Sequence, residues 1–116
     1  MTTRNLTTAE FEELTSREGI TLVDFWAEWC GPCHRFAPTY EKVSENHPDI
    51  TFAKVDTEAE PALAAELNIF SIPTIMAIRD GVVVFQQAGA LPEHLLENLI
   101  SKVRELDMEK VKAEAA

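Results

Sequence analysis

The hydrophobic and polar positions of the first half of the chain follow two patterns. Residues 20–27 form a nearly unbroken apolar run rich in β-branched and aromatic residues, which predicts a central strand covered on both faces. Residues 50–56 predict a second strand. Before the first strand, apolar residues recur at helical spacing. Thr7 and Glu10 fit a capping box at the start of that helix, and we expect Gly19 to stop it.

Helices are predicted to connect and follow these strands. The segment 29–34 leads into a helical pattern that continues through Val43, with Pro38 placed to kink it. Pro61 stands where the first turn of a short third helix would begin. Strands and helices therefore alternate along the chain, an order typical of an α/β fold.

The last third of the chain predicts a hairpin and a helix. Residues 74–78 and 82–85 read as antiparallel strands, because the Asp80-Gly81 dipeptide between them is a strong hairpin signal. A final helix is predicted to open near Pro92, with apolar residues at helical spacing. These residues are Leu95, Leu96, Leu99, Ile100, Val103 and Leu106.

Length, charge and the absence of long apolar runs narrow the class of protein. A chain of 116 residues is one domain of ordinary size. Its net charge of −10 disfavours binding to nucleic acid or to an anionic membrane surface. No run approaches the ~20 apolar residues of a membrane span, and residues 1–8 lack a secretory signal. We expect a monomeric cytoplasmic protein with a domain over 1–107, and 108–116 as a C-terminal helix extension or frayed tail.

The only two cysteines, Cys30 and Cys33, carry the candidate chemistry. A bond between them would contribute roughly 2 kcal/mol through loop entropy, less than a long-range crosslink, so redox chemistry is the better reason for the pair. Cys30 falls at a strand-to-helix junction, where helix N-terminal amides favour a thiolate. Cys33 would lie one turn further on the same face, where it can attack a mixed disulfide formed at Cys30. The spacing predicts a nucleophile followed by a resolving thiol.

Asp24 is an acid inside the apolar run of the first strand. Desolvation would raise the pKa of its carboxyl and suit it to exchange a proton near neutrality. The alternative is a carboxylate that turns toward water at the end of the strand.

The segment from Val23 to Cys33 resembles the active-site segment of the thioredoxin family. Further family markers follow in the same order between residues 4 and 105: Ala37-Pro38, Ala53–Asp56, Ser71–Thr74, Gly81 and Gly89-Ala90. The resemblance implies an α/β thioredoxin fold, with a central five-stranded mixed β-sheet flanked by four helices. It also implies a protein disulfide reductase that acts on client proteins and is recharged by a flavin- and NADPH-dependent thioredoxin reductase. No bound cofactor is required, because the dithiol itself carries two electrons.

The resemblance also implies roles for individual residues. Asp24 would help to deprotonate Cys33, and Lys54 on the neighbouring strand would be its buried charge partner, although a strand lysine is more often exposed. Pro73 would form a cis peptide bond facing the cysteines, whereas most X-Pro bonds in folded proteins are trans. The backbone of Ile72 would pair with an extended client. The implied groove is lined by Trp29, Gly31, Pro32, Ile72, Pro73, Gly89 and Ala90.

Some residues depart from the family pattern or admit another interpretation. Trp29 could pack in the core, but Trp26 already serves that purpose and we expect Trp29 to be exposed. His34 stands where many relatives carry lysine; it is either a pH-dependent charge near the site or an exposed histidine. Asn68 and Ser71 stand where glycines are common in relatives, so the family pattern does not predict the shape of the loop before Pro73 or the clients that it favours.

Three other functions are compatible with parts of the sequence. Residues 30–34 also match the Cys-X-X-Cys-His pattern of c-type haem attachment, a function that would need export of the protein to a haem-attaching compartment. The two thiolates and His34 are candidate zinc ligands, although a second cysteine pair is missing. A thioredoxin-fold binding module or chaperone would use the groove without redox turnover. Gly31 and Pro32 between the cysteines are typical of the reductants of the family and favour the enzyme.

Overall fold

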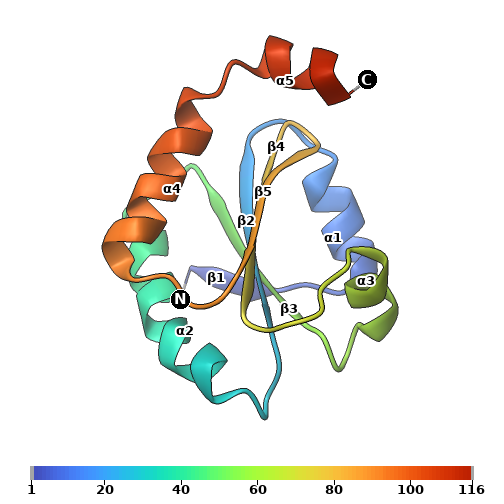
Figure 1. The fold of residues 1–116 in the computed structure, drawn as a ribbon, viewed down its shortest axis with the longest axis vertical. Coiled ribbons are helices and arrows are strands. Elements are labelled where there is room, and N and C mark those ends of the chain that lie inside the picture. Colours follow the sequence, from blue (N-terminus) through green and yellow to red (C-terminus); the bar gives the residue numbers. More distant parts are fainter. Residues whose placement is uncertain (1, 116) are drawn as a thin grey trace.

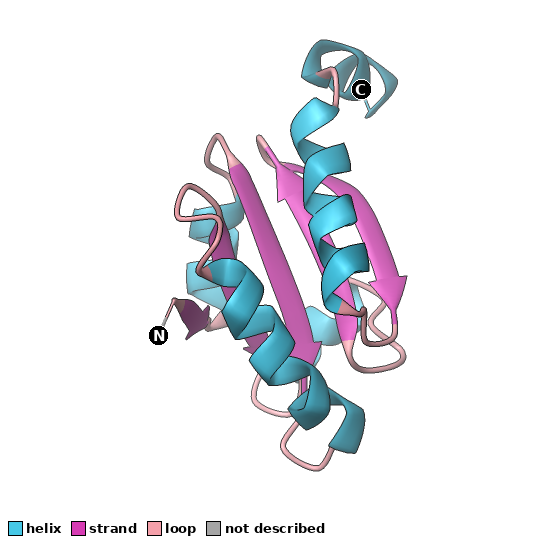
Figure 2. Ribbon diagram, turned by 90° about the vertical axis from the view of Figure 1, so that its left-hand side faces the viewer, coloured by secondary structure: helices cyan, strands magenta, loops and turns pink. Residues whose placement is uncertain are grey.

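The computed structural model describes residues 2–115 and contains one mixed five-stranded sheet with the order β1-β3-β2-β4-β5. β1, β3 and β2 are parallel, and β4 is antiparallel to both β2 and β5. The strands are β1 (Thr3–Asn5), β2 (Ile20–Trp26), β3 (Thr51–Asp56), β4 (Thr74–Arg79) and β5 (Val82–Ala88). The helices are α1 (Thr8–Thr15), α2 (Gly31–Ser44), α3 (Pro61–Glu66), α4 (Glu93–Glu105) and α5 (Met108–Ala115). Helices α2 and α4 cover one face of the sheet, and α1 and α3 cover the other (Figures 1 and 2).

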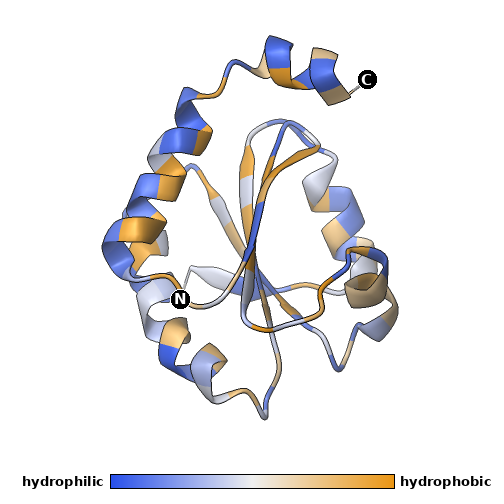
Figure 3. Ribbon diagram, viewed as in Figure 1, coloured by the Kyte–Doolittle hydropathy of each residue, from blue (hydrophilic) through white to orange (hydrophobic). Residues whose placement is uncertain are grey.

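The strand β2 lies in the middle of the sheet, as its apolar run predicted. Leu22 packs in the cluster formed with α2 and α4, whereas Val23 and Phe25 pack in the cluster formed with α1 and α3. Because side chains alternate along a strand, Asp24 lies on the same face as Leu22, under α2. Hydrophobic residues follow the inner strands, while the outer helices alternate hydrophobic and hydrophilic positions (Figure 3).

The beginning of α1 agrees with the sequence, but its end does not. The side chain of Thr7 accepts a hydrogen bond from the backbone of Glu10, and the Glu10 carboxylate accepts one from the backbone of Thr7, so the capping box is present. The helix already ends at Thr15, and Gly19 does not stop it. Gly19 has a φ of 100° and donates its N–H to the Asp80 carboxylate over 2.8 Å. It shapes the entry into β2.

The first strand, β1, was not predicted from its own residues. It has only three residues and no apolar alternation. Its backbone pairs in parallel with β3 at the edge of the sheet, and the Thr3 hydroxyl donates to the Glu41 carboxylate of α2 over 2.5 Å. Both partners are distant in the sequence, so the strand depends on tertiary contacts.

The hairpin and the final helix agree with the sequence at their ends. Asp80 and Gly81 have φ values of 52° and 82°, as a tight hairpin turn between β4 and β5 requires. α4 starts directly after Pro92. Its residues Leu96, Leu99, Ile100 and Val103 are buried. Leu95 is 43% exposed, so it does not belong to the core face that the spacing predicted for it.

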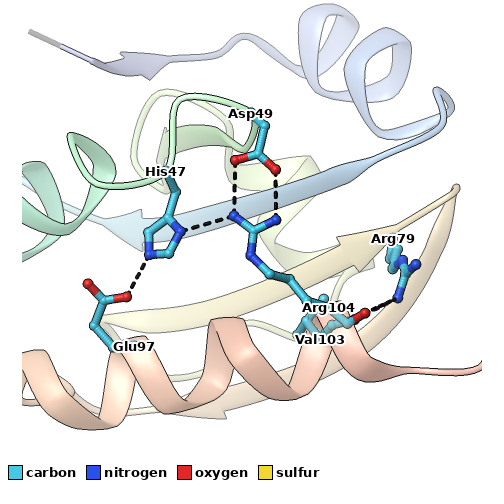
Figure 4. Close-up of polar contacts among 6 residues, drawn as sticks. All are labelled: His47, Asp49, Arg79, Glu97, Val103 and Arg104. Carbon is cyan, nitrogen blue, oxygen red and sulfur yellow. Dashed lines mark hydrogen bonds and ion pairs between the residues drawn. The ribbon is translucent and has the colours of Figure 1, made fainter.

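A polar network fastens α4 to the loop between α2 and β3 (Figure 4). The Arg104 guanidinium donates to both carboxylate oxygens of Asp49, over 2.7 and 3.0 Å, and contacts the His47 ring over 3.0 Å. The other ring nitrogen of His47 lies 2.5 Å from the Glu97 carboxylate. Hydrogen bonds from Arg104 lower the pKa of Asp49 to about 2. The network holds the C-terminal half of α4 in register with the sheet.

The last helix, α5, extends beyond α4 and has no buried residue (Figure 1). The Lys112 ammonium lies 4.0 Å from the Asp80 carboxylate at the tip of the hairpin. Within residues 2–115, no helix is both long and apolar enough to cross a membrane.

Candidate functional site

The two cysteines form a disulfide at the start of α2. Cys30 is the N-cap residue of the helix, and the Cys33 N–H donates to its sulfur over 3.2 Å. Their Cα atoms lie 5.3 Å apart, and both residues are buried. Pro32 fits the first turn, because no helical hydrogen bond requires its missing N–H there. The junction predicted from the sequence therefore aims helix amides at the Cys30 sulfur.

The second side of the site is the turn before β4. The Ile72-Pro73 peptide bond is cis, as the resemblance implied. The Ile72 carbonyl oxygen lies 3.7 Å from the Cys30 sulfur, and the Pro73 carbonyl accepts a hydrogen bond from Gly89 over 2.7 Å. Three segments distant in the sequence thus meet at the disulfide: the start of α2, the turn at Pro73 and the end of β5.

The expected groove residues border this junction. Trp29 is 70% exposed, and its indole N–H donates to the Glu58 carboxylate over 2.8 Å. Ile72 is half-buried, and Pro73 is buried. The other four expected groove residues are exposed: Gly31, Pro32, Gly89 and Ala90.

Sequence reasoning missed an exposed apolar residue in the loop that leads to Pro73. Phe70 is 87% exposed and stands two positions before Ile72. A large apolar residue in a loop next to an expected cis-proline was the available signal, because solvent-exposed phenylalanine contributes nothing to the core.

The loop that carries Ile72 is shaped by Asn68, one of the two departures from the family pattern. Asn68 has a φ of 59° at the end of α3. The Asn68 N–H bonds the Ala65 carbonyl and the Ile69 N–H bonds the Ala64 carbonyl, which together form a Schellman motif. Asparagine therefore adopts the left-handed conformation that a glycine would supply. Ser71 accepts a hydrogen bond from the Thr74 hydroxyl through its carbonyl.

Asp24 lies on the sheet face beneath α2, and it is 1% exposed. Its Oδ1 atom has no hydrogen-bond partner. Desolvation by burial raises the pKa of this carboxyl to about 7, while the charge of Lys54 acts in the opposite direction. The pKa of the carboxyl therefore lies near neutral pH, the condition in which a group both accepts and returns protons. The alternative of a strand-end carboxylate in water is wrong.

The expected role of Lys54 as a buried partner of Asp24 needs correction. The two residues are register partners on β3 and β2, but Lys54 is only half-buried. Its ammonium lies over the ring of Trp26, 4.9 Å from the centroid, and no ion pair with Asp24 forms. A long lysine side chain can bury its aliphatic stem while its ammonium lies away from the carboxylate, here over the indole.

His34 lies on the outer side of α2. It is exposed, and its Nε2 atom lies 2.5 Å from the Glu28 carbonyl oxygen, with the ring edge-on to Trp26. Over residues 2–115, no group of three His, Cys, Asp or Glu side chains is arranged to hold a metal ion.

A Cys-X-X-Cys pair at a helix start, facing a cis-proline on a five-stranded mixed sheet, defines a thiol–disulfide oxidoreductase. The thioredoxin family model matches residues 2–102. A Streptomyces coelicolor protein whose name places it among the thioredoxins is 50% identical over 114 residues, 98% of this chain and 85% of the relative. The chain therefore belongs to the thioredoxin family.

Other relatives agree. A thioredoxin of Listeria monocytogenes is 38% identical over 100 residues, which cover 85% of this chain and 96% of the relative. The structure of a mutant thioredoxin from Halobacterium salinarum superimposes with a TM-score of 0.81 at 33% identity, covering 89% of this chain and 90% of the other. The protein is a protein-disulfide reductase whose clients are proteins with disulfides. Nothing in these comparisons favours a binding module without redox activity.

Proposed function

We propose that Cys30 is the nucleophile and Cys33 the resolving thiol in the reduction of client disulfides. The Cys30 thiolate attacks one client sulfur; the Cys30–client bond forms, the client disulfide breaks, and the first client thiolate takes a proton from water. Cys33 then loses its proton, and its thiolate attacks the Cys30 sulfur. The Cys30–Cys33 disulfide forms, the second client thiolate leaves, and two electrons have passed to the client. The observation that carries the assignment is the Cys33 N–H directed at the Cys30 sulfur at the helix start.

Asp24 accepts the proton that Cys33 loses, in this proposal. Its burial on the sheet face under α2 and its pKa of about 7 support that role. Lys54 assists from the neighbouring strand, because its charge lowers the pKa of Asp24 and keeps part of the population ionised. Lys54 is a positioning residue that acts through Asp24.

The client chain lies in the groove around the disulfide. We assign substrate binding to Trp29, Gly31, Pro32, Ile72, Pro73, Gly89 and Ala90. The short distance from the Cys30 sulfur to the Ile72 carbonyl supports this assignment, because a client cysteine bonded to Cys30 would lie beside that backbone.

The oligomeric state, the location and the reducing partner are also part of the proposal. The protein works as a monomer in the cytoplasm, and a flavin- and NADPH-dependent thioredoxin reductase returns the disulfide to the dithiol. Residues 1–107 are the catalytic domain and 108–116 an appendage; the family match over 2–102 and the absence of buried residues in α5 support this division. Residues 1 and 116 lie outside the described part of the chain.

Insulin reduction with the Cys30→Ser and Cys33→Ser variants tests the assignment. Cys30→Ser should lose turnover and form no client adduct, whereas Cys33→Ser should stop at a mixed disulfide that mass spectrometry detects on Cys30. An adduct that forms on Cys33 in the Cys30→Ser variant at the wild-type rate would reverse the roles. The reduction potential of the pair should be more reducing than the cytosolic glutathione pool. A markedly more oxidising potential would make the protein an oxidase or isomerase.

A further inference from the structure

We propose that Arg35 and the hollow beside the cysteine pair bind a carboxylate of the client, so that disulfides flanked by Asp or Glu are reduced preferentially. The inference rests on the proposed attack by Cys30, because the client must be held at that sulfur. It adds a specificity-determining residue outside the expected groove.

The hollow borders the start of α2 and has a volume of about 310 Å³. One wall is the outer side of the first turns of α2, with Pro32, Arg35 and Thr39. The other wall is the segment from Ala90 to Pro92, directly before α4. Pro32 and Ala90 also belong to the expected groove, so the hollow continues the surface on which the client lies.

The Arg35 side chain folds back toward the start of the helix. Its Nη1 atom lies 3.3 Å from the position that a Cβ on Gly31 would occupy. Gly31 directly follows Cys30, so the guanidinium is next to the backbone of the reacting cysteine. Glycine at position 31 leaves the space in which the guanidinium lies.

The guanidinium has no acidic partner of its own. Across residues 2–115, no hydrogen bond or ion pair uses it. In the same range Arg4 on β1 is also unpaired, whereas Arg17, Arg79 and Arg104 are all engaged. The neighbours of Arg35 on α2, one turn away on either side, carry no acid. The acid that begins the facing helix α4, Glu93, is held by Lys42 over 3.0 Å.

These features favour a carboxylate as the missing partner. A guanidinium presents a planar fork of donors that matches a carboxylate in two-point contact. The Trp29 side of the groove is acidic, because Glu58 binds the Trp29 indole and Glu28 precedes it. A client acid is therefore attracted to the Arg35 side and repelled from the Trp29 side. Because the guanidinium lies beside Gly31, directly after Cys30, we place the acid at the positions that flank the client cysteine.

Single-turnover reduction of three synthetic peptides tests the inference. Each peptide has one intramolecular disulfide, with both cysteines flanked by Asp, Asn or Lys, and is mixed with pre-reduced full-length protein while peptide thiol is quantified. The intrinsic reactivity of each peptide cancels when the Asp-to-Asn rate ratio of wild type is divided by that of Arg35→Gln. This quotient should be about threefold at low salt, the size expected of one exposed ion pair, and should decline at 0.5 M salt. Arg35→Glu should shift the preference toward the Lys peptide.

Arg4→Gln is the matched control, since it removes an exposed arginine on β1 that is likewise unpaired in the described part of the chain, outside the hollow. Its Asp-to-Asn ratio should equal that of wild type. Equal ratios in wild type and Arg35→Gln would overturn the inference while leaving the function of Cys30 intact. If wild type reduced none of the three peptides, the proposed function would fail, and the carboxylate subsite with it.

Discussion

Asp24 and Lys54 are register partners on β2 and β3, yet their side chains do not pair. The Asp24 carboxyl stays under α2 with one oxygen unbonded, and the Lys54 ammonium lies over the Trp26 ring instead. Burial therefore dominates the pKa of Asp24 and raises it to about 7. A fully paired carboxylate would be ionised throughout the neutral range and could not exchange a proton with a thiol.

The stability of the protein should depend on pH through Asp24. The folded state binds this proton more tightly than the unfolded chain, so stability is lost as pH rises from about 4 to about 7. Asp24→Asn removes that loss. We expect the free energy of unfolding of the variant to exceed that of wild type by up to about 4 kcal/mol at pH 8, from three pKa units at about 1.36 kcal/mol each.

Urea unfolding of both oxidised proteins at pH 4.5 and pH 8 measures this difference. The gain should shrink sharply at pH 4.5, where Asp24 is protonated in the folded state. Glu12→Gln, an exposed carboxylate of α1, should change the stability little at either pH. A gain of equal size at both values would show that titration of Asp24 is not its cause.

The same substitution should change the reaction rate. In the proposed mechanism an unprotonated Asp24 accepts the Cys33 proton, so the wild-type rate of the resolving step should rise as pH increases through about 7. Asp24→Asn should slow that step about 10²-fold or more at pH 7 and abolish the inflection. Rapid-quench measurement of the decay of the Cys30–client mixed disulfide gives the rate directly. An unchanged inflection in the variant would assign it to another group.

Arg79 should stabilise the end of α4. From β4 its Nη1 atom lies 2.8, 3.1 and 3.0 Å from the carbonyl oxygens of Val103, Arg104 and Leu106, which share its two hydrogens, and Figure 4 shows the contact with Val103. Hydrogen bonds from a charged donor to the last carbonyls offset the unfavourable helix end. Arg79→Met should lower the free energy of unfolding by about 1–3 kcal/mol.

Chemical denaturation checks this value against two other variants. Arg79→Lys should recover part of the loss, because its ammonium still faces the negative end of the helix dipole. Arg17→Met removes only an exposed pair with Glu13 and should cost less than about 1 kcal/mol. Equal losses for Arg79→Met and Arg17→Met would contradict the capping role.

Asn68 should tolerate glycine better than a branched residue. At its φ of 59°, a β-branched side chain clashes with the backbone, whereas glycine is unstrained. Asn68→Gly should change the free energy of unfolding by less than about 1 kcal/mol, and Asn68→Val should reduce it by about 1–2 kcal/mol. Thermal unfolding of the two variants measures the difference. A valine variant as stable as the glycine variant would show that the left-handed conformation is absent in solution.

Removal of residues 108–116 should leave the catalytic domain intact. The helix α5 buries no residue, and its ion pair from Lys112 to Asp80 is long, at 4.0 Å, with the lysine about half exposed. A chain that ends at residue 107 should retain wild-type insulin turnover and lose less than about 1 kcal/mol of stability. Loss of turnover in a folded truncated protein, as judged by circular dichroism, would make α5 part of the active unit.

Signals that lie within a few consecutive residues were readable from the sequence. The apolar run of β2, the capping box at Thr7, the Asp80-Gly81 turn and the spacing of Cys30 and Cys33 each depend on local backbone geometry. The chemistry of the cysteine pair followed from the same local signals, since a helix start after a strand is enough to aim amides at Cys30. The cis bond at Pro73 required the family resemblance, because one X-Pro dipeptide does not reveal its isomer.

Tertiary structure decided every feature that depends on neighbours distant in the chain. β1 exists through its pairing with β3, and the Lys54 ammonium lies over Trp26 because the packed strands leave it there. The sequence marked Asp24 as an unusual acid, but only the packing of α2 over the sheet sets its pKa. The sequence alone indicated which atoms we expect to react, since covalent spacing and helix geometry are local. Which protonation state they hold and which clients they meet depends on burial and charge, and these arise only when the elements pack together.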